Sequence, residues 1–411
     1  MVRFDKIIEL GIIIGLIIFA IGSPFSISLA QIGFVSALVF WILRLIFIRD
    51  VKFKGTFIDI FLLIYIIGLF LSSIFSIKPI ESLKANKNIW LFSMIYLIVN
   101  NVDLNFSKRL LKIILISATL SGVYGIFQSL TGIDILGRNL GKYGRHIYGA
   151  WGGFGLHLTY GGYQMMISLI ILAIAIYSLK SFDTKIKILI IISYLINFFS
   201  VILSFSRTAW IGFFSGLVIL GLIGLFKKKN VGLLLLIAGI FLLIIILFLF
   251  IPAIKYRFLS VFRDLKYSTR TELWDGAFEM IKDYPVFGVG SGMFSKHFLK
   301  YKPNYKGAYG HPHNDFLAAY LRAGIIGFIG FIMIFSVFII KMFKFYKELL
   351  KEGFKLYSSL ILGFVSSVIG FLVAGLGQNY FTDSENAMLL FFVFGISFVI
   401  YNNLKNRISV P

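Results

Sequence analysis

The residues best suited to chemistry lie at 311–327, where two histidines and an asparagine come directly before a long apolar run. A lipid-buried helix needs no histidine at its entrance for stability. A neutral imidazole accepts a proton near pH 7, so His313 is the candidate general base and His311 the second choice. The alternatives are a histidine hydrogen-bonded within the loop and a weak metal site. We expect no metal, because the chain has no cysteine and no carboxylate triad.

A second candidate is Arg207, in a Ser-Phe-Ser-Arg-Thr-Ala-Trp turn between two apolar runs. Ser206 suits the N-cap of the following helix, which places Arg207 in the first helical turn. An arginine at membrane depth costs about 2.5–3.5 kcal/mol on insertion scales, so such residues tend to be kept for function. The alternative is an arginine whose side chain only reaches the outer lipid headgroups.

A third candidate is Arg270, at the start of a predicted amphipathic helix. Thr269 and Glu272 have the spacing of a capping box. Apolar residues at i, i+3, i+4 and i+7 then form one stripe, and Pro285 and Gly288 close the segment; the stripe is Trp274, Ala277, Phe278 and Ile281. We expect this helix to lie on the outer surface, with Arg257, Arg263 and Lys266 as nearby cations. The alternative is an arginine that meets only lipid phosphate.

These three features favour an anion site. Helix N-termini carry unpaired N–H groups and a partial positive charge, and guanidinium groups pair bidentately with phosphate oxygens. Arg207 and Arg270 together therefore suggest a diphosphate ligand. A proton acceptor such as His313 beside a bound diphosphate implies a displacement, in which a hydroxyl group attacks and the diphosphate leaves.

The composition defines the class of protein. Hydrophobic residues make up 59% of the 411 residues, and the mean hydropathy is +0.92. These values predict an all-α, polytopic transmembrane helical bundle. The first apolar stretch is expected to be retained, because no cleavage site follows it. We predict about 12 spans, at 7–24, 29–48, 57–76, 86–101, 109–128, 160–180, 187–204, 208–226, 231–252, 314–341, 356–376 and 386–402.

The net charge of +22 is distributed in the manner of membrane orientation rather than of nucleic-acid binding. With the N-terminus inside, basic residues cluster in the inner loops, and only Lys78, Lys84 and Lys87 oppose the trend. We therefore expect both termini in the cytoplasm. All five histidines then fall in two outer segments, 129–159 and 253–313; they are His146, His157, His297, His311 and His313. We expect any chemistry to face outward.

The predicted organisation has three parts. Residues 1–252 hold spans 1–9, with an outer loop near 129–159. Residues 253–313 form a large periplasmic loop that contains the amphipathic helix. Residues 314–411 hold spans 10–12 and a cytoplasmic tail.

The motifs resemble those of the O-antigen ligase and polymerase superfamily of bacterial membrane glycosyltransferases. The resemblance covers about residues 204–330. It rests on the Ser206-Arg207 pair, on Arg270-x3-Trp274 leading to Pro285-Val-Phe-Gly288-Val-Gly290, and on His313-Asn314-x9-Gly324-x2-Gly327. Arg322 is a departure, because relatives often have glutamate at that place.

The resemblance implies an enzyme of lipopolysaccharide biosynthesis in the bacterial inner membrane, with its site facing the periplasm. Such a ligase moves a polysaccharide from undecaprenyl diphosphate to a lipid A-core acceptor, inverting the anomeric centre without a metal or other cofactor. Arg207 and Arg270 would hold the diphosphate and His313 would activate the acceptor hydroxyl. The further residues expected to contact substrate are Asn314, His311, Ser206, Arg263 and Trp274.

Two other functions stay open at this point. A polymerase for O-antigen or exopolysaccharide uses the same carrier and shares these motifs, although many polymerases carry two large outer loops. A transporter of the lipid-linked glycan ranks last, because transporters usually place ionisable residues at mid-membrane. The predicted spans here have interiors almost free of charge. The expected partners are the lipid-linked glycan, a lipid A-core or other glycan acceptor and membrane lipids, with no nucleic acid.

Overall fold

The computed structural model describes residues 2–48, 52–144, 146–225, 239, 246, 249–267 and 269–408. Within these residues the regular elements are helices, and the only strand-like pairing is an isolated bridge between Lys142 and Tyr148. The all-α prediction is confirmed. The helices are α1 (Val2–Gly22), α2 (Ile27–Phe47), α3 (Asp59–Ile74), α4 (Pro79–Ala85), η1 (Lys87–Phe92), α5 (Ser93–Asn101), α6 (Leu104–Thr131), α7 (His157–Tyr177), η2 (Leu179–Ser181), α8 (Thr184–Leu203), α9 (Arg207–Leu225), α11 (Pro252–Tyr267), α12 (Thr269–Asp283), α13 (Phe294–Tyr301), α14 (Asp315–Lys351), α15 (Lys355–Gly375) and α16 (Ser384–Ile408).

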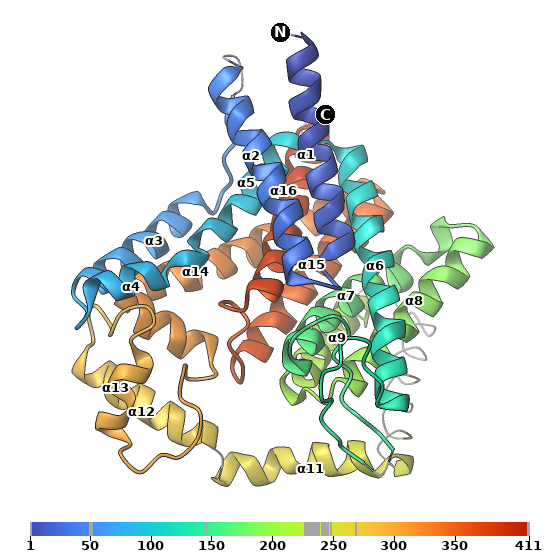
Figure 1. Ribbon diagram of the computed structural model, residues 1–411. Coiled ribbons are helices and arrows are strands. Elements are labelled where there is room, and N and C mark those ends of the chain that lie inside the picture. Colours follow the sequence, from blue (N-terminus) through green and yellow to red (C-terminus); the bar gives the residue numbers. More distant parts are fainter. Residues whose placement is uncertain are drawn as a thin grey trace.

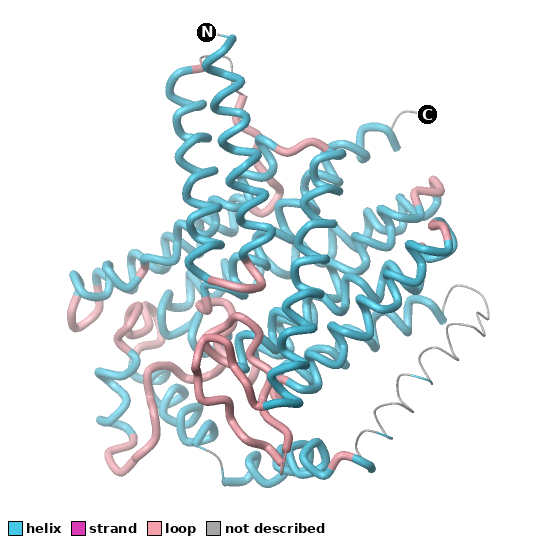
Figure 2. Tube along the Cα trace, turned by 45° about the vertical axis from the view of Figure 1, so that its right-hand side comes forward, coloured by secondary structure: helices cyan, strands magenta, loops and turns pink. Residues whose placement is uncertain are grey.

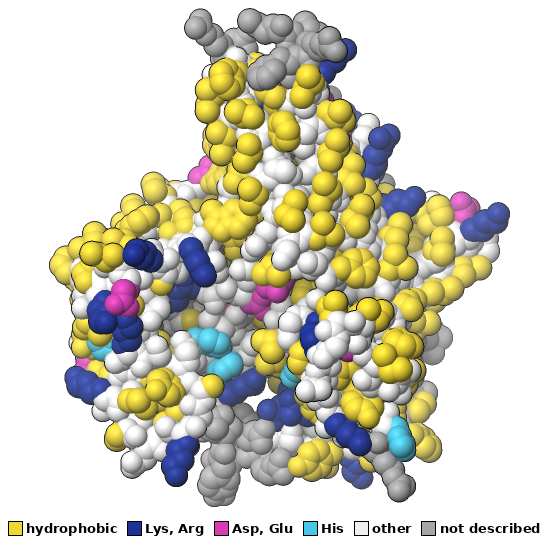
Figure 3. Space-filling view, in the orientation of Figure 1, with side chains coloured by type: hydrophobic (Ala, Val, Ile, Leu, Met, Phe, Trp, Pro, Cys, Tyr) yellow, Lys and Arg dark blue, Asp and Glu magenta, His cyan; other side chains and the backbone are white. Residues whose placement is uncertain are grey.

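Length and apolar composition identify a multi-pass membrane protein. Among the described residues, seven helices are long and apolar enough to cross a bilayer, namely α2, α6, α7, α8, α14, α15 and α16. Helices α3 and α9 are apolar but shorter. Large apolar side chains such as Ile32 and Ile46 are more than 60% exposed on α2. Apolar side chains cover the upper helices in Figure 3, as expected of a surface that faces lipid.

One predicted span differs from the structure. The sequence predicts a single helix over 86–101, but this stretch is divided into η1 and the nine-residue α5. The side chains at its start explain the division. Asn86 donates to Ser73 Oγ at 2.9 Å and Asn88 donates to the Thr382 carbonyl at 3.0 Å, so both amides bond to other segments. The span predicted at 231–252 lies almost wholly outside the described residues.

The molecule has two distinct ends. Helix α1 begins and α16 ends in the upper part of the view, whereas the loops near 132–156 and 302–314 gather in the lower part (Figures 1 and 2). The segment at 253–313 contains α11, α12 and α13, which lie along the same lower side. Only the helix at 269–283 was predicted there; α11 and α13 are additional.

Helix α14 carries the site and is broken near its start. Gly324 has φ 63° and ψ −171°, which interrupts the helix between its first turns and its membrane-length part. Because the helical bonding stops there, the Leu321 carbonyl accepts from the backbone N–H groups of Val289 and Gly290, at 2.8 and 3.1 Å. Ile325 N–H in turn donates to the Val286 carbonyl at 3.0 Å. The two glycine-containing motifs of the sequence thus pack against each other.

Candidate active site

The start of α14 is fixed by Asn314. Its side-chain oxygen accepts from the backbone N–H groups of Phe316 and Leu317, at 2.9 and 3.1 Å, as an N-cap does. Its amide nitrogen donates to the Leu376 carbonyl at 3.0 Å. Asn314 is buried, so it attaches the beginning of α14 to the end of α15 and holds the preceding histidines in place.

His313 is oriented by Gln378. Its Nδ1 lies 3.0 Å from Gln378 Oε1, in the turn between α15 and α16. The backbone of His313 has φ 50°, a conformation that a non-glycine residue seldom adopts. Asp315 faces elsewhere and accepts from the Phe381 backbone N–H at 3.0 Å. The partner of the histidine is therefore an amide that the sequence analysis did not identify, and Asp315 does not play this role.

The two histidines form a pair with low basicity. Their ring centroids lie 4.1 Å apart, and the His313 backbone N–H donates to His311 Nδ1 at 3.2 Å. Burial, the neighbouring His313 and Arg270 lower the pKa of His311 to about 4. Burial and Arg270 lower the pKa of His313, and the hydrogen bond to Gln378 opposes this shift. Both rings are neutral at pH 7, which is the form that accepts a proton.

Arg270 lies beside the histidines, in the first turn of α12. It acts electrostatically on His311 and His313, and a Cβ placed on Gly377 would lie 3.6 Å from its Nη1 atom. The helix is the one predicted, but its buried residues are shifted. Leu273, Ala277 and Met280 are buried, at i, i+4 and i+7, whereas Phe278 is 53% exposed. The segment packs on α14 with this neighbouring stripe.

Trp274 bonds to the segment 311–313, which carries both histidines and is called the histidine turn below. Its indole N–H donates to the Pro312 carbonyl at 3.0 Å, between the two histidines. Trp274 was predicted to contact substrate. That contact stays a prediction, and in the structure the indole N–H positions the loop that carries His311 and His313.

Arg207 is the first residue of α9, as predicted, and belongs to a second cationic group. Its Nη1 donates to Ser260 Oγ at 3.0 Å. On α11, the helix that carries Ser260, Arg257 donates from Nε to the Phe205 carbonyl at 3.0 Å. Its guanidinium group lies 5.3 Å from the centre of the Tyr143 ring. Burial raises the pKa of Tyr143, and Arg257 and Arg207 both oppose the rise. Arg257 is thus a second guanidinium close to Arg207.

The turn at 376–380 joins the two groups. A Cβ on Gly377 would lie 2.8 Å from Thr208, next to Arg207, and 3.6 Å from Arg270. Gln378 bonds to His313, and the buried Tyr380 hydroxyl lies 3.2 Å from Thr208 Oγ1. One short turn therefore bonds to Thr208, the residue after Arg207, and to His313, and its Gly377 lies next to Arg270. The sequence signal for it is a polar Gly-Gln-Asn-Tyr run between two apolar spans.

Two further residues, Ser206 and Arg263, were predicted to contact substrate. Ser206 is fully buried, and its hydroxyl lies 3.4 Å from that of Tyr380 and accepts from Ala209 N–H at 3.4 Å, as a helix cap. Arg263 lies on α11, but its side chain falls outside the described residues. In Figure 3, histidine and basic side chains border a hollow in the lower half of the molecule, with acidic side chains above it.

These observations define the class of protein. It is a multi-pass helical membrane protein with two guanidinium groups and a neutral histidine at one end. Residues 192–332 match the family model described as O-Antigen ligase. This match confirms the resemblance to the O-antigen ligase superfamily seen in the motifs, over residues 192–332. No curated protein matches the chain. The matched region contains Arg207, Arg270 and His313, whereas Gln378 lies beyond it.

Proposed function

We propose that this protein transfers a polysaccharide from undecaprenyl diphosphate to a lipid A-core acceptor at the periplasmic face of the bacterial inner membrane. The family match supports a glycosyltransferase of the O-antigen ligase or polymerase type. The observation that carries the proposal is the turn at 376–380, which bonds to Thr208 beside Arg207 and to His313, and whose Gly377 lies next to Arg270. This turn supports the proposal that residues far apart in the sequence form one cationic site with a proton acceptor.

The donor diphosphate would lie between the guanidinium groups of Arg207 and Arg270. Both arginines come from the first turn of a helix, where the helix dipole also favours an anion. Paired guanidinium groups neutralise the charge that grows on the leaving diphosphate. Arg257 adds positive charge beside Arg207, and the expected further contacts are Asn314, His311 and Ser206.

The acceptor hydroxyl would be activated by His313. With Nδ1 donating to Gln378, Nε2 holds the lone pair that takes the hydroxyl proton. The hydroxyl oxygen forms a bond to the anomeric carbon as the bond from that carbon to the diphosphate oxygen breaks. Attack opposite the leaving group inverts the anomeric centre. The proton ends on His313, and undecaprenyl diphosphate departs.

A second candidate function is a polymerase that extends glycan on the same carrier. The segment at 132–156 favours it, because this segment packs against the site rather than away from it. Tyr143 stacks on Phe205 with ring centroids 4.3 Å apart, and its hydroxyl lies 3.3 Å from His157 Nε2. Arg138 orders the segment by bonding to Asp134 and to the Gly152 carbonyl. A second outer segment at the site is a feature of many polymerases.

Lipopolysaccharide gels on a deletion strain test the proposal and separate the two functions. Loss of a ligase leaves long glycan on the carrier and bare lipid A-core. Loss of a polymerase leaves a single repeat on the lipid A-core. Complementation with the His313→Ala variant must fail if the site is correct, whereas His146→Ala, an exposed histidine of the other loop, must restore the wild-type pattern. Restoration by His313→Ala would refute the proposed site.

A further inference from the structure

A separate cavity of about 230 Å³ lies on the other side of the histidine turn. It is lined by α4 and η1, by the loop after Val289, by the histidine turn, by the first turns of α14 and by the turn before α16. The polar lining residues are Asn88, His311, Arg322, Asn379 and Thr382. Arg207 and Arg270 are not in its wall. His311 therefore borders this cavity and is also close enough to Arg270 to feel its charge.

Arg322 brings a positive charge to the cavity without a matching anion. Its hydrogen bond is a long one, from Nε to Ser291 Oγ at 3.4 Å. Among the described residues no carboxylate lies within ion-pair distance of its guanidinium group. The nearby Asp315 instead accepts from the Phe381 backbone N–H. A half-buried guanidinium group facing a cavity is suited to bind a phosphate or carboxylate.

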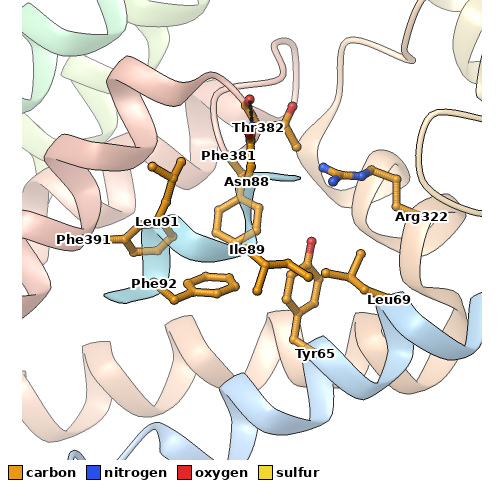
Figure 4. A pocket seen from close by; sticks show the side chains of 10 residues that line it. All are labelled: Tyr65, Leu69, Asn88, Ile89, Leu91, Phe92, Arg322, Phe381, Thr382 and Phe391. Atoms are coloured by element: carbon orange, nitrogen blue, oxygen red, sulfur yellow. Dashed lines mark hydrogen bonds between the residues drawn. The ribbon is translucent and has the colours of Figure 1, made fainter. Parts of the chain in front are cut away.

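The wall of the same cavity also supplies an acceptor that lacks a partner. Asn379 is 7% exposed and donates from Nδ2 to Thr382 Oγ1 at 2.6 Å, but its Oδ1 atom has no hydrogen bond. Asn88 donates to the Thr382 carbonyl. Figure 4 shows Arg322, Thr382 and Asn88 around a smaller adjoining cavity, with the guanidinium group directed toward the side of Thr382. A buried amide oxygen without a donor is suited to accept from a sugar hydroxyl.

Two lysines next to the cavity support an anionic ligand. Lys84 lies in a predicted outer loop and Lys87 at the outer end of the span predicted at 86–101, so both oppose the charge distribution expected of a membrane protein. Both are exposed, and their chain neighbours Ala85 and Asn88 line the cavity. The two lysines that depart from the positive-inside rule thus lie next to the cavity lined by Arg322.

We propose that this cavity binds an anionic sugar of the acceptor, one that carries a phosphate or a carboxylate, and presents its hydroxyl to His313. The inference rests on the proposed glycosyl transfer and adds the chemical class of the acceptor. The volume is smaller than the roughly 300–1,000 Å³ of pockets for drug-sized molecules, so it suits one charged sugar rather than an oligosaccharide. Arg322 is the residue that recognises the anion.

The test uses the full-length protein and the lipid A-core acceptor from the deletion strain. The acceptor is offered intact, dephosphorylated with a phosphatase, or with its carboxylic acids reduced to alcohols. The variants are Arg322→Gln and Arg322→Lys, and Lys300→Gln serves as the control because Lys300 is exposed on α13. Thermal unfolding of each purified variant confirms folding.

We expect Arg322→Gln to lower kcat/KM on the intact acceptor by about 10- to 100-fold, the size expected for a lost charge-assisted hydrogen bond. Arg322→Lys should recover part of the activity. The kcat/KM of the wild-type enzyme should fall by a similar factor when the recognised group is removed from the acceptor. Whether dephosphorylation or reduction of the carboxylic acids causes this fall distinguishes a phosphate from a carboxylate. Arg322→Gln should then cause little further loss on that acceptor.

Equal loss in Arg322→Gln on all three acceptors would overturn the inference, as would an acceptor preference of wild type that neither treatment changes. Failure of the proposed function looks different. In that case His313→Ala would retain activity on every acceptor, whatever the behaviour of the Arg322 variants.

Discussion

The Nδ1 atom of His313 lies 3.0 Å from the side-chain oxygen of Gln378, a residue 65 positions further along the chain. Because an amide oxygen can only accept, the proton of the neutral ring is on Nδ1 and the lone pair is on Nε2. The amide also opposes the lowering of the His313 pKa by burial. Gln378 therefore fixes the orientation of the proposed base and partly offsets the lowering of its pKa by burial.

The first prediction concerns pH. The pKa of His313 lies below its ordinary value of 6.5, and the active form is the deprotonated ring. The value of kcat/KM should therefore rise with pH through that pKa and stay level above about pH 7. Gln378→Glu places a carboxylate beside the ring, which favours the charged form and should move the acidic limb upward by about one to three pH units.

The measurement is glycan transfer from pH 4.5 to 8.5. The control is Asn403→Asp, which adds the same charge at the far end of α16 and should leave the profile unchanged. An acidic limb that does not move in Gln378→Glu would mean that another group titrates.

The second prediction concerns the two arginines. Arg207→Ala and Arg270→Ala should each lower kcat by about 10²- to 10³-fold, the range found when one group that stabilises the transition-state charge is removed. The lysine variants should recover only part, because lysine lacks the bidentate fork. Membrane insertion should stay normal, and Lys300→Ala should behave as wild type. Normal transfer in both alanine variants would remove the diphosphate site from the proposal.

The third prediction concerns Trp274. Trp274→Phe removes the indole N–H bonded to the Pro312 carbonyl while keeping an aromatic ring. The loss of such a bond costs about 0.5–1.5 kcal/mol, and it should lower kcat several-fold with little effect on the donor KM. Trp151→Phe is the matched control, because the Trp151 indole N–H is buried without a partner. Comparable losses in the two variants would argue against a positioning role for Trp274.

The fourth prediction concerns the break in α14. Gly324→Ala must adopt a positive φ, and its Cβ would lie 2.3 Å from the Val286 carbonyl oxygen. We expect a loss of about 1–3 kcal/mol in stability, measured as thermal unfolding in detergent. Gly155→Ala is the control, because nothing lies within 4 Å of a Cβ there. An unchanged unfolding temperature for Gly324→Ala would mean that α14 tolerates a regular helix at this point.

The fifth prediction concerns divalent ions. Because arginines neutralise the leaving diphosphate in the proposed reaction, chelators should leave the rate of transfer unchanged. The measurement is transfer before and after treatment with a chelator. A loss that one divalent ion restores would require a metal in the mechanism.

Sequence reasoning predicted the elements with local signals. Apolar runs predicted the membrane class, and the start of α9 at Arg207 and the helix that begins at Thr269 each follow from neighbouring residues. The exceptions depend on distant partners. Asn86 and Asn88 bond to other segments, and this divides the stretch from 86 to 101. The buried stripe of α12 is set by its packing against other segments rather than by its own period.

The site itself was only partly predictable for the same reason. Arg207, Arg270 and His313 stand out because charged or titratable residues are rare near apolar runs. Gln378 and Arg257 carry weaker signals, since Gln378 lies in a short polar run between two apolar spans and Arg257 is one arginine among several. Their importance comes from contacts to residues many positions away, which no single sequence displays.

The histidine turn separates two walls that come from different stretches of chain. One wall consists of α9, α12 and the turn at 376–380, and it holds the arginines proposed to bind the diphosphate of the carrier. The other, with α4, η1 and Arg322, encloses the second cavity. Since these walls share few residues, substitutions in the second cavity can change which acceptor is recognised without disturbing the cations proposed to hold the carrier.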